Sequence, residues 1–247
     1  MAIDKAEDIC NMALMRCGSN KPILSLTERS ASAEACNTFY ANCRDRALEA
    51  YPWPFATRRD RLVPLEADDW VETTTYAIDA LVTYGDKIWR ALTATTGDQP
   101  DESTANWTQV TRDGWSYVCE LPDDFILAQY VAPFGAPMHD SSQRTPFKIE
   151  ESDDSNDRKL LLTNEADPVL VYTAKIETFA VLPPSFVSAV AWLLASELYN
   201  ALRSDPEGSA KAFKAYLFAV GDAASAQQRG QREAAEPDSE FTLARER

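Results

Sequence analysis

Four of the five cysteines form two pairs whose members stand seven residues apart: Cys10 with Cys17, and Cys36 with Cys43. Seven residues is close to two helical turns, so each pair lies on one face of a helix. One interpretation is a four-thiolate zinc site between two helices, but structural zinc sites use much shorter spacings. Small buried residues that let helices pack closely are the favoured interpretation. An odd number of cysteines also argues against a disulfide framework, and we expect no metal and no cofactor.

Catalytic groups would have to come from the adjacent acids Asp123 and Asp124 or from the single histidine, His139. A glycoside hydrolase needs two carboxylates that flank a cleft, whereas neighbouring residues on an extended segment point to opposite faces. A serine nucleophile beside His139 is unsupported, since no G-x-S-x-G elbow accompanies it. P-loop, nucleotide-loop and zincin motifs do not occur in the sequence. We expect the protein not to be an enzyme; a cell-wall-directed glycoside hydrolase remains the alternative.

The elements that position these residues are helices near both ends of the chain. Apolar residues recur at helical spacing before Gly18, within residues 28–50, and after the Pro183-Pro184 pair. A last helix is predicted within residues 209–229, with one apolar side made of Ala212, Phe213, Tyr216, Leu217, Val220 and Ala224.

The middle of the chain favours strands, because the helical period is lost from residue 57 to residue 180. Strands are predicted at 62–63, 115–119, 147–149, 160–163 and 169–174. The predicted fold class is α+β: a four-helix bundle formed by the N- and C-terminal helices, with a β-rich middle region and a small inserted β module. The expected boundaries are 1–56 and 183–229 for the bundle, 57–65 and 113–182 for the β-rich region, 66–112 for the inserted module and 230–247 for a flexible C-terminal tail.

The formal net charge of −15 excludes some classes of partner. A protein that binds DNA without sequence preference needs clustered Lys and Arg to displace counterions, and this chain has no basic run. No apolar run approaches the roughly 18 residues that span a bilayer, so we expect no membrane partner. The N-terminus lacks the features of a secretory signal, and we expect synthesis in a cytoplasm.

Four local patterns stand out along the chain. The most specific is Tyr51-Pro52-Trp53-Pro54-Phe55-Ala56, which follows Tyr40-x-x-x-Arg44-Asp45-x-x-Leu48. A second pattern is Gly18 with Ile23-Leu24-Ser25-Leu26, and a third is Trp115-x-Tyr117 with Leu121-Pro122-Asp123-Asp124. The fourth is Phe186-x-x-Ala189-x-Ala191-Trp192-Leu193-Leu194-Ala195, together with the C-terminal residues 239–245. In this order they resemble the tail tubular protein A family, the head-to-tail adaptors of short-tailed phages. For Trp53 itself, core packing is favoured over an interface contact.

The resemblance implies a structural virion protein at the head-tail junction, assembled in the host cytoplasm. Its subunits would form a closed ring, about twelve copies in the family, that joins the portal to tail or nozzle proteins. The ring would line the channel through which DNA passes without tight binding. The C-terminal pattern implies a portal-binding tail, in which Phe241 and Leu243 supply apolar contacts and Arg245 a bidentate hydrogen bond. The family usually carries Trp where this chain has Phe241.

Segment 66–112 has a resemblance of its own, carried by Tyr76-x-x-Asp79-x-Leu81-Val82-Thr83-Tyr84-Gly85-Asp86-Lys87-Ile88-Trp89-Arg90-Ala91 with Pro100 and Trp107. It is similar to the carbohydrate-binding family 5/12 modules of chitinases, which carry a Gly-Asp turn where this chain has Asp79-Ala80. Because exposed aromatic faces can stack on sugars, the candidate sugar-binding residues are Tyr76, Tyr84, Trp89 and Trp107. They could instead form the core of a tiny sheet. We favour this for Trp89, since Ile88 and Trp89 point to opposite faces of a strand.

We expect the purified protein to leave duplex DNA unretarded in a gel-shift assay at low ionic strength. A surface with an excess of carboxylates repels phosphate and cannot release counterions from it. Micromolar affinity for duplex DNA under these conditions would contradict this expectation.

Overall fold

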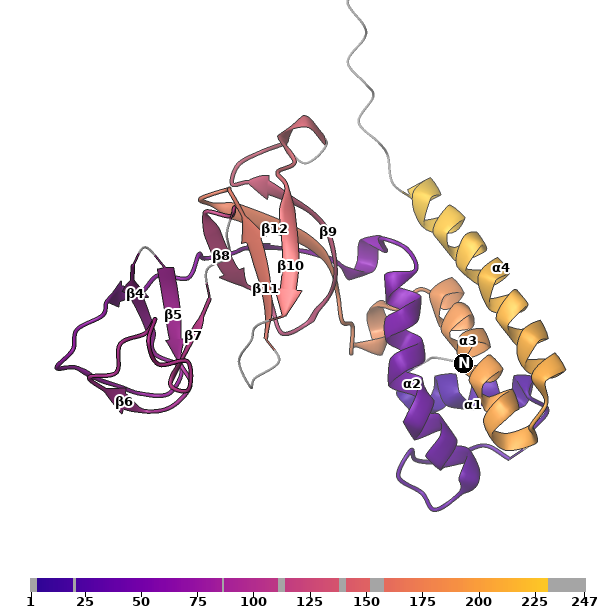
Figure 1. The fold of residues 1–247 in the computed structure, drawn as a ribbon. Helices are drawn as coiled ribbons and strands as arrows, with labels where there is room; N and C mark the ends of the chain where they lie inside the picture. Colours follow the sequence, from indigo (N-terminus) through magenta and orange to yellow (C-terminus); the bar gives the residue numbers. More distant parts are fainter. Residues whose placement is uncertain are drawn as a thin grey trace, which may run out of the picture. The chain divides into compact units, whose positions relative to one another are not determined.

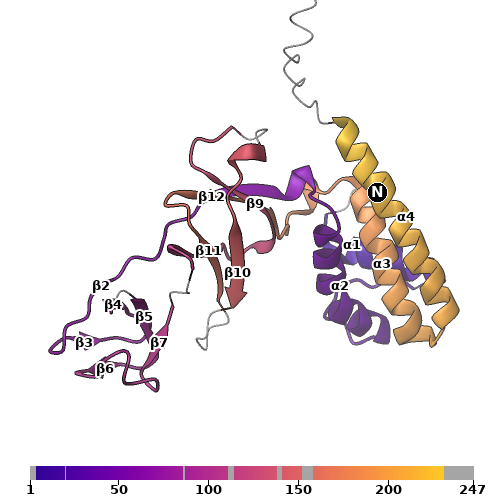
Figure 2. The same cartoon turned by 45° about the horizontal axis from the view of Figure 1, so that its top comes forward.

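The computed structural model of this chain divides into two compact units, one helical and one built of strands (Figures 1 and 2). The helical unit contains residues 1–57 and 174–247, and the β unit contains residues 58–173. The β unit is therefore inserted in sequence between two halves of the helical unit. The structure describes residues 4–19, 21–85, 87–110, 114–137, 141–151 and 158–230.

The described part of the helical unit has one central helix, α3, with three others packed on it. The helices are α1 (Ala6–Arg16), α2 (Ala31–Glu49), α3 (Pro184–Arg203) and α4 (Pro206–Gly230). Helix α3 contacts each of the others, whereas α1 and α2 meet only slightly, and α1 crosses α3 instead of running beside it (Figure 1). The fold is α+β, but the prediction of a four-helix bundle is wrong: α1, α2 and α4 each pack on α3, and α1 and α2 have little contact with each other.

The composition of α3 gives the physical reason for this arrangement. Its buried positions include the runs 189–191 and 193–196, so burial extends over most of the circumference of the helix. A helix that is apolar on all sides must be covered on several sides. By length and mean hydropathy, 1.2, α3 could also cross a membrane, but 56% of its apolar window is buried inside the protein. Core helices of globular proteins meet the same criterion, so this finding is weak support for a membrane span.

Polar side chains also tie the two halves of the helical unit together. From α1, the Arg16 guanidinium donates to the carbonyl oxygen of Ser188 at 2.8 Å. From α3, the Tyr199 hydroxyl donates to the carbonyl oxygen of Arg16 at 3.0 Å, and Arg203 donates to that of Gly18 at 2.9 Å. The bonds from Tyr199 and Arg203 satisfy carbonyl groups at the end of α1, which the helix itself leaves without partners.

The Pro-Trp-Pro element after α2 is part of the helical core. Trp53 is fully buried, and its indole nitrogen donates to the carbonyl oxygen of Ala47 at 2.8 Å. The ring of Phe186, from α3, meets Trp53 edge-on with centroids 5.2 Å apart, and it meets Phe55 at 5.0 Å. The core role favoured for Trp53 is confirmed.

The β unit contains two three-stranded sheets. Their orders are β1-β12-β9 and β10-β11-β8. The strands are β1 (Thr57–Arg61), β8 (Tyr117–Glu120), β9 (Phe125–Pro133), β10 (Phe147–Glu151), β11 (Lys159–Thr163) and β12 (Pro168–Ala174). Strand β11 is central to the second sheet, where Leu161 lies opposite Cys119 on one side and Ile149 on the other.

The segment predicted as an inserted module forms a four-stranded sheet, β2-β4-β5-β7, and a small strand pair, β3-β6. Its strands are β2 (Asp68–Asp69), β3 (Thr75–Tyr76), β4 (Leu81–Tyr84), β5 (Lys87–Ala91), β6 (Thr95–Thr96) and β7 (Trp107–Gln109). Strand β4 pairs with β2 in parallel and with β5 in antiparallel orientation.

Both faces of this four-stranded sheet bury side chains. On one face, Val82 and Trp89 belong to a cluster with Trp107. On the other face, Leu81 and Ile88 pack against a cluster that includes Leu160 and Leu162 of β11 and Val118 of β8. The expectation that Ile88 and Trp89 point to opposite faces is confirmed, and the inserted sheet shares a core with β8 and β11.

We expect Trp53→Ala to lower the free energy of unfolding by about 3–5 kcal/mol, because it leaves a cavity against α3 and removes a buried aromatic side chain. Leu24→Ala, at a side chain that is 82% exposed, is the control and should change stability by about 0.5 kcal/mol or less. Chemical denaturation of both variants gives the comparison. Equal effects would show that the element is not part of the core.

Candidate functional site

The candidate sugar-binding aromatics lie largely inside the inserted sheet. Trp107 is 1% exposed, and Trp89 is also buried. Their indole nitrogens donate to the carbonyl oxygens of Asp98 at 2.9 Å and Tyr84 at 3.1 Å, respectively. Tyr76 packs edge-on against Trp107, with centroids 5.4 Å apart. A buried indole has no free face on which a pyranose could stack, so Trp89 and Trp107 serve the core.

Aromatic surface remains at the half-buried residues Tyr84 and Trp70, which meet edge-on with centroids 5.5 Å apart. Trp70 lines a shallow hollow of about 520 Å³ whose other walls are polar: Glu72, Gly97, Asp98, Gln99, Glu102 and Ser103. Burial, with the nearby charges of Asp101 and Glu102, raises the pKa of Tyr84. Trp70 was not among the predicted site residues, because it precedes the stretch that carries the resemblance. A tryptophan among polar residues could have indicated it.

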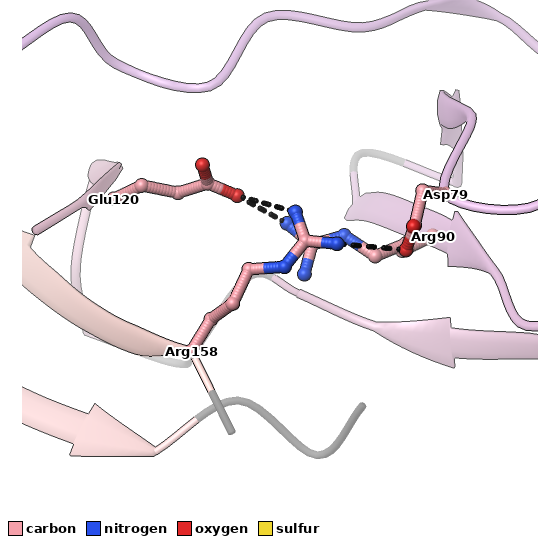
Figure 3. Close-up of polar contacts among 4 residues, drawn as sticks. All are labelled: Asp79, Arg90, Glu120 and Arg158. Carbon is pink, nitrogen blue, oxygen red and sulfur yellow. Dashed lines mark hydrogen bonds and ion pairs between the residues drawn. The ribbon is translucent and has the colours of Figure 1, made fainter. Parts of the chain in front are cut away.

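A group of four charged side chains links the inserted sheet to β8 and β11 (Figure 3). Arg90 of β5, with a side chain only 1% exposed, donates to Glu120 Oε1 at 2.8 Å. Arg158, next to β11, donates to the same oxygen at 3.1 Å. Arg158 also pairs with Asp79, with Nη2 and Oδ1 2.9 Å apart. A buried guanidinium needs such partners, so this charged group positions β5 against β8.

Asp79 itself stands in a turn with φ of 68°, in the left-handed region that favours glycine. Asp and Asn tolerate this conformation better than other residues with side chains. The Asp79 backbone nitrogen donates to the carbonyl oxygen of Ala91 at 2.8 Å, and its carboxylate binds Arg158. Asp79 thus adds a second carboxylate, besides that of Glu120, to the charged group.

A second hollow, of about 320 Å³, borders the charged group. Its lining residues are Glu120, Leu121, Pro122, Asp123, Phe125, Arg158 and Lys159. The pattern Leu121-Pro122-Asp123-Asp124 therefore forms part of its wall. Cationic and anionic groups face it together, and Glu120 Oε1 already accepts from two guanidinium groups.

The adjacent acids of this turn have different surroundings. Asp123 lines the hollow, whereas Asp124 binds Arg58 and lies with its Oδ1 2.9 Å from the hydroxyl of Tyr172. The same hydroxyl is 2.7 Å from Asp60 Oδ2. Burial and these two carboxylates raise the pKa of Tyr172 far above its ordinary value. Asp124 thus joins strands together, and only Asp123 of the two faces the hollow.

The cysteines all lie in the interior as free thiols. Cys10 and Cys36 are hydrogen-bonded to each other, and this contact raises the pKa of Cys10 and lowers that of Cys36. Cys17 Sγ lies 3.3 Å from the carbonyl oxygen of Ala195 and acts as its donor. Among the residues the structure describes, no group of three or more His, Cys, Asp or Glu side chains could hold a metal ion. The thiols of Cys10 and Cys17 pack α1 against α2 and α3, respectively.

Helix α4 carries several large apolar side chains that are exposed. Its inner face is buried at Ala212, Tyr216 and Ala223. Phe213, Leu217 and Phe218 are 38%, 55% and 80% exposed. The predicted single apolar side of this helix is therefore divided between a buried part and an exposed part. The proposed tail residues Phe241, Leu243 and Arg245 lie outside the described residues, as does His139.

No family model matches this chain, and no curated protein matches it.

We expect Glu120→Gln to lower the free energy of unfolding by about 1–3 kcal/mol, because two guanidinium groups lose their charged acceptor while the side chain keeps its shape. Glu102→Gln, at an exposed acid of the same unit, should change stability by about 0.5 kcal/mol or less. Thermal and urea unfolding of the two variants measures the difference. Matching values for both would show that the charged group contributes nothing to stability.

Proposed function

We propose that this chain is a structural virion protein, one subunit of a head-to-tail adaptor ring in a tailed phage. In this proposal the ring joins the portal to tail or nozzle proteins, and DNA passes through its channel without tight binding. The protein acts by contact and not by catalysis.

The observation that carries the proposal is the position of the adaptor-like patterns in the fold. Trp53 and Phe186, from two different patterns, meet in the core of the helical unit. Gly18 follows α1 with φ of 74° and accepts from Arg203. The turn at Asp124 joins β8 to β9 and is held by Tyr172. The described parts of the four patterns therefore lie at packing contacts and turns of the fold, and this supports the proposal.

The surface of the helical unit supports the same proposal. A ring subunit needs two different contact surfaces, one for each neighbour. Exposed apolar patches on otherwise polar proteins commonly mark such contacts. The exposed residues of α4 form one apolar surface, and Met15 and Leu24, 72% and 82% exposed, lie elsewhere on the unit.

The polar lining of the hollows fits catalysis less well. Asp124 is bound to Arg58 and lies against Tyr172, and the Glu120 carboxylate serves two arginines. A hydrolase needs carboxylates available on both sides of a substrate. A fold alone does not define a function, so assembly is the property to test.

We expect truncation after Arg229 to leave the melting temperature of the subunit unchanged and to abolish binding to the cognate portal ring, seen by electron microscopy of the mixture. The C-terminal residues supply the apolar and charged groups for this contact and are not needed by the helical core. Rings that form on the portal at the full-length concentration would overturn the role of the tail.

A matched pair of substitutions in the full chain refines this experiment. Phe241→Ala should weaken portal binding by about 2 kcal/mol, roughly 30-fold, as expected for an aromatic residue central to an interface. Phe241→Trp, which restores the residue usual in the family, should preserve binding.

A further inference from the structure

A mostly apolar hollow of about 200 Å³ lies beside α1. Its lining residues are Asn11, Leu14, Met15, Ser19, Lys21 and Pro22. The Asn11 amide holds one wall in place, because it accepts from the backbone nitrogen of Ile23 at 2.8 Å and donates to the carbonyl oxygen of the same residue at 3.0 Å. Nearby, the backbone nitrogen of Ser19 donates to the carbonyl oxygen of Leu14 at 2.9 Å. The hollow is therefore preformed by α1 and the segment that follows it.

Phe218 projects from the surface of α4. Its side chain is 80% exposed. A Cβ added at Gly221, one turn further along the same face, would meet no atom within 4 Å, so the ring has open space beside it. A cavity of about 150 Å³ is large enough for a benzene ring, and aromatic side chains seated in a pocket of the partner often dominate protein interfaces. Phe218 therefore suits a hollow of the size found beside α1.

The charges next to this ring and next to the hollow are opposite. Asp222 lies four residues after Phe218 and so shares its face of α4. Lys21 lines the hollow. Neither Asp222 nor Lys21 has an ion-pair partner within the part of the chain that the structure describes. A Phe218 ring seated in such a hollow would bring the Asp222 carboxylate toward the Lys21 ammonium.

We propose that Phe218 of one copy of this chain inserts into the hollow beside Met15 of a second copy, and that Asp222 of the first copy pairs with Lys21 of the second. The proposal rests on the adaptor role, in which this is the contact between neighbouring subunits of the ring. Two different surfaces meet in it, so the contact is heterologous and can repeat from copy to copy until a ring closes. A direct contact between two α4 faces would leave the hollow empty and would end at a dimer.

One subunit can use both surfaces at once, because they lie apart in the helical unit. Gly18, next to the hollow, accepts from Arg203 at the end of α3. Phe218 lies 12 residues beyond Pro206, the first residue of α4, which in a helix is about 18 Å. A neighbour seated in the hollow thus leaves Phe218 available for the next copy.

Disulfide trapping between two variants of the full-length chain tests the contact without a portal. One variant is Gly221→Cys, one turn after Phe218, and the other is Ser19→Cys, in the wall of the hollow. They are mixed in equal amounts at about 0.15 M salt, which screens charges more than about 8 Å apart, and are treated with oxidised glutathione. Mass spectrometry of the intact products separates the mixed dimer from the two same-variant dimers. The five native cysteines are buried, so they compete little with the introduced thiols.

We expect the mixed dimer to form faster than either same-variant dimer by about tenfold or more, because the contact raises the effective concentration of the two thiols. Phe218→Ala in the Gly221→Cys variant should abolish this preference. The matched control is Phe213→Ala, which lies five residues earlier on another face of α4 and should leave the preference unchanged. Dimers in the proportions of chance collision would overturn the proposal. An excess of dimers between two Gly221→Cys copies would also overturn it, and would show that two α4 faces meet.

Exchange of the two charges gives a second measurement. Asp222→Lys in the Gly221→Cys variant should slow formation of the mixed dimer severalfold, because it places an ammonium group opposite Lys21. Adding Lys21→Glu to the Ser19→Cys variant should then restore the rate. The net charge of −15 alone predicts the reverse for Asp222→Lys, since a less negative copy is repelled less. An unchanged or faster reaction after Asp222→Lys would therefore contradict the proposed pair.

The contact between copies and the adaptor role can fail separately. If the mixed dimer does not form but subunits still assemble on the cognate portal ring, the copies meet through other surfaces and only this contact is wrong. If the mixed dimer forms but no ring appears on the portal by electron microscopy, the contact stands and the adaptor role fails.

Discussion

The helical unit depends on one constraint: α3 is buried over most of its circumference and must be covered on several sides at once. No single neighbour can do this, because a packed helix covers only one face of another. Helices α1, α2 and α4 therefore each contribute one apolar stripe, and Trp53 and Phe55 close a further side at Phe186. The same constraint brings both ends of the chain together, so the strands between them must begin and end close to each other. The hydrogen bond from Leu62 to the carbonyl oxygen of Pro168 pairs the first and last strands of the β unit.

Local patterns in the sequence predict the helices and several strands, including β10, β11 and β12, because each has its own apolar period. They do not predict β9, which is mostly half-buried and has only Val131 fully buried; its strand conformation comes from pairing with β12. The two-residue strands of the insert have too few residues for any period. The four-helix bundle was wrongly predicted because the apolar stripe of a helix does not identify the element that it packs against. A stripe on α4 shows that the helix is amphipathic, but it does not show that Ala212 meets α3 while Leu217 faces solvent.

The sequence predicts those features of the candidate site that arise within one short segment, and it does not predict contacts between distant segments. Alternation along β5 is enough to separate Ile88 from Trp89 and to assign Trp89 to a core. The charged group of Arg90, Glu120 and Arg158 comes from three separate segments, and no local pattern joins them. Its physical effect is nevertheless clear. It neutralises a guanidinium that the shared core of the insert buries, so the insert and the sheet β8-β11 are linked by charges as well as by apolar side chains.

The division of the helical unit between the two ends of the chain also determines the order in which its parts can fold during synthesis. Helices α1 and α2 leave the ribosome more than a hundred residues before α3, and domains generally fold as units while the chain grows. Until α3 emerges, the apolar faces with which α1 and α2 pack on it have no partner. The β unit, whose last strand ends at Ala174, can complete its sheets first. The nascent chain thus carries its most apolar helix among the last segments to appear, when α1 and α2 are already present and α4 is about to follow.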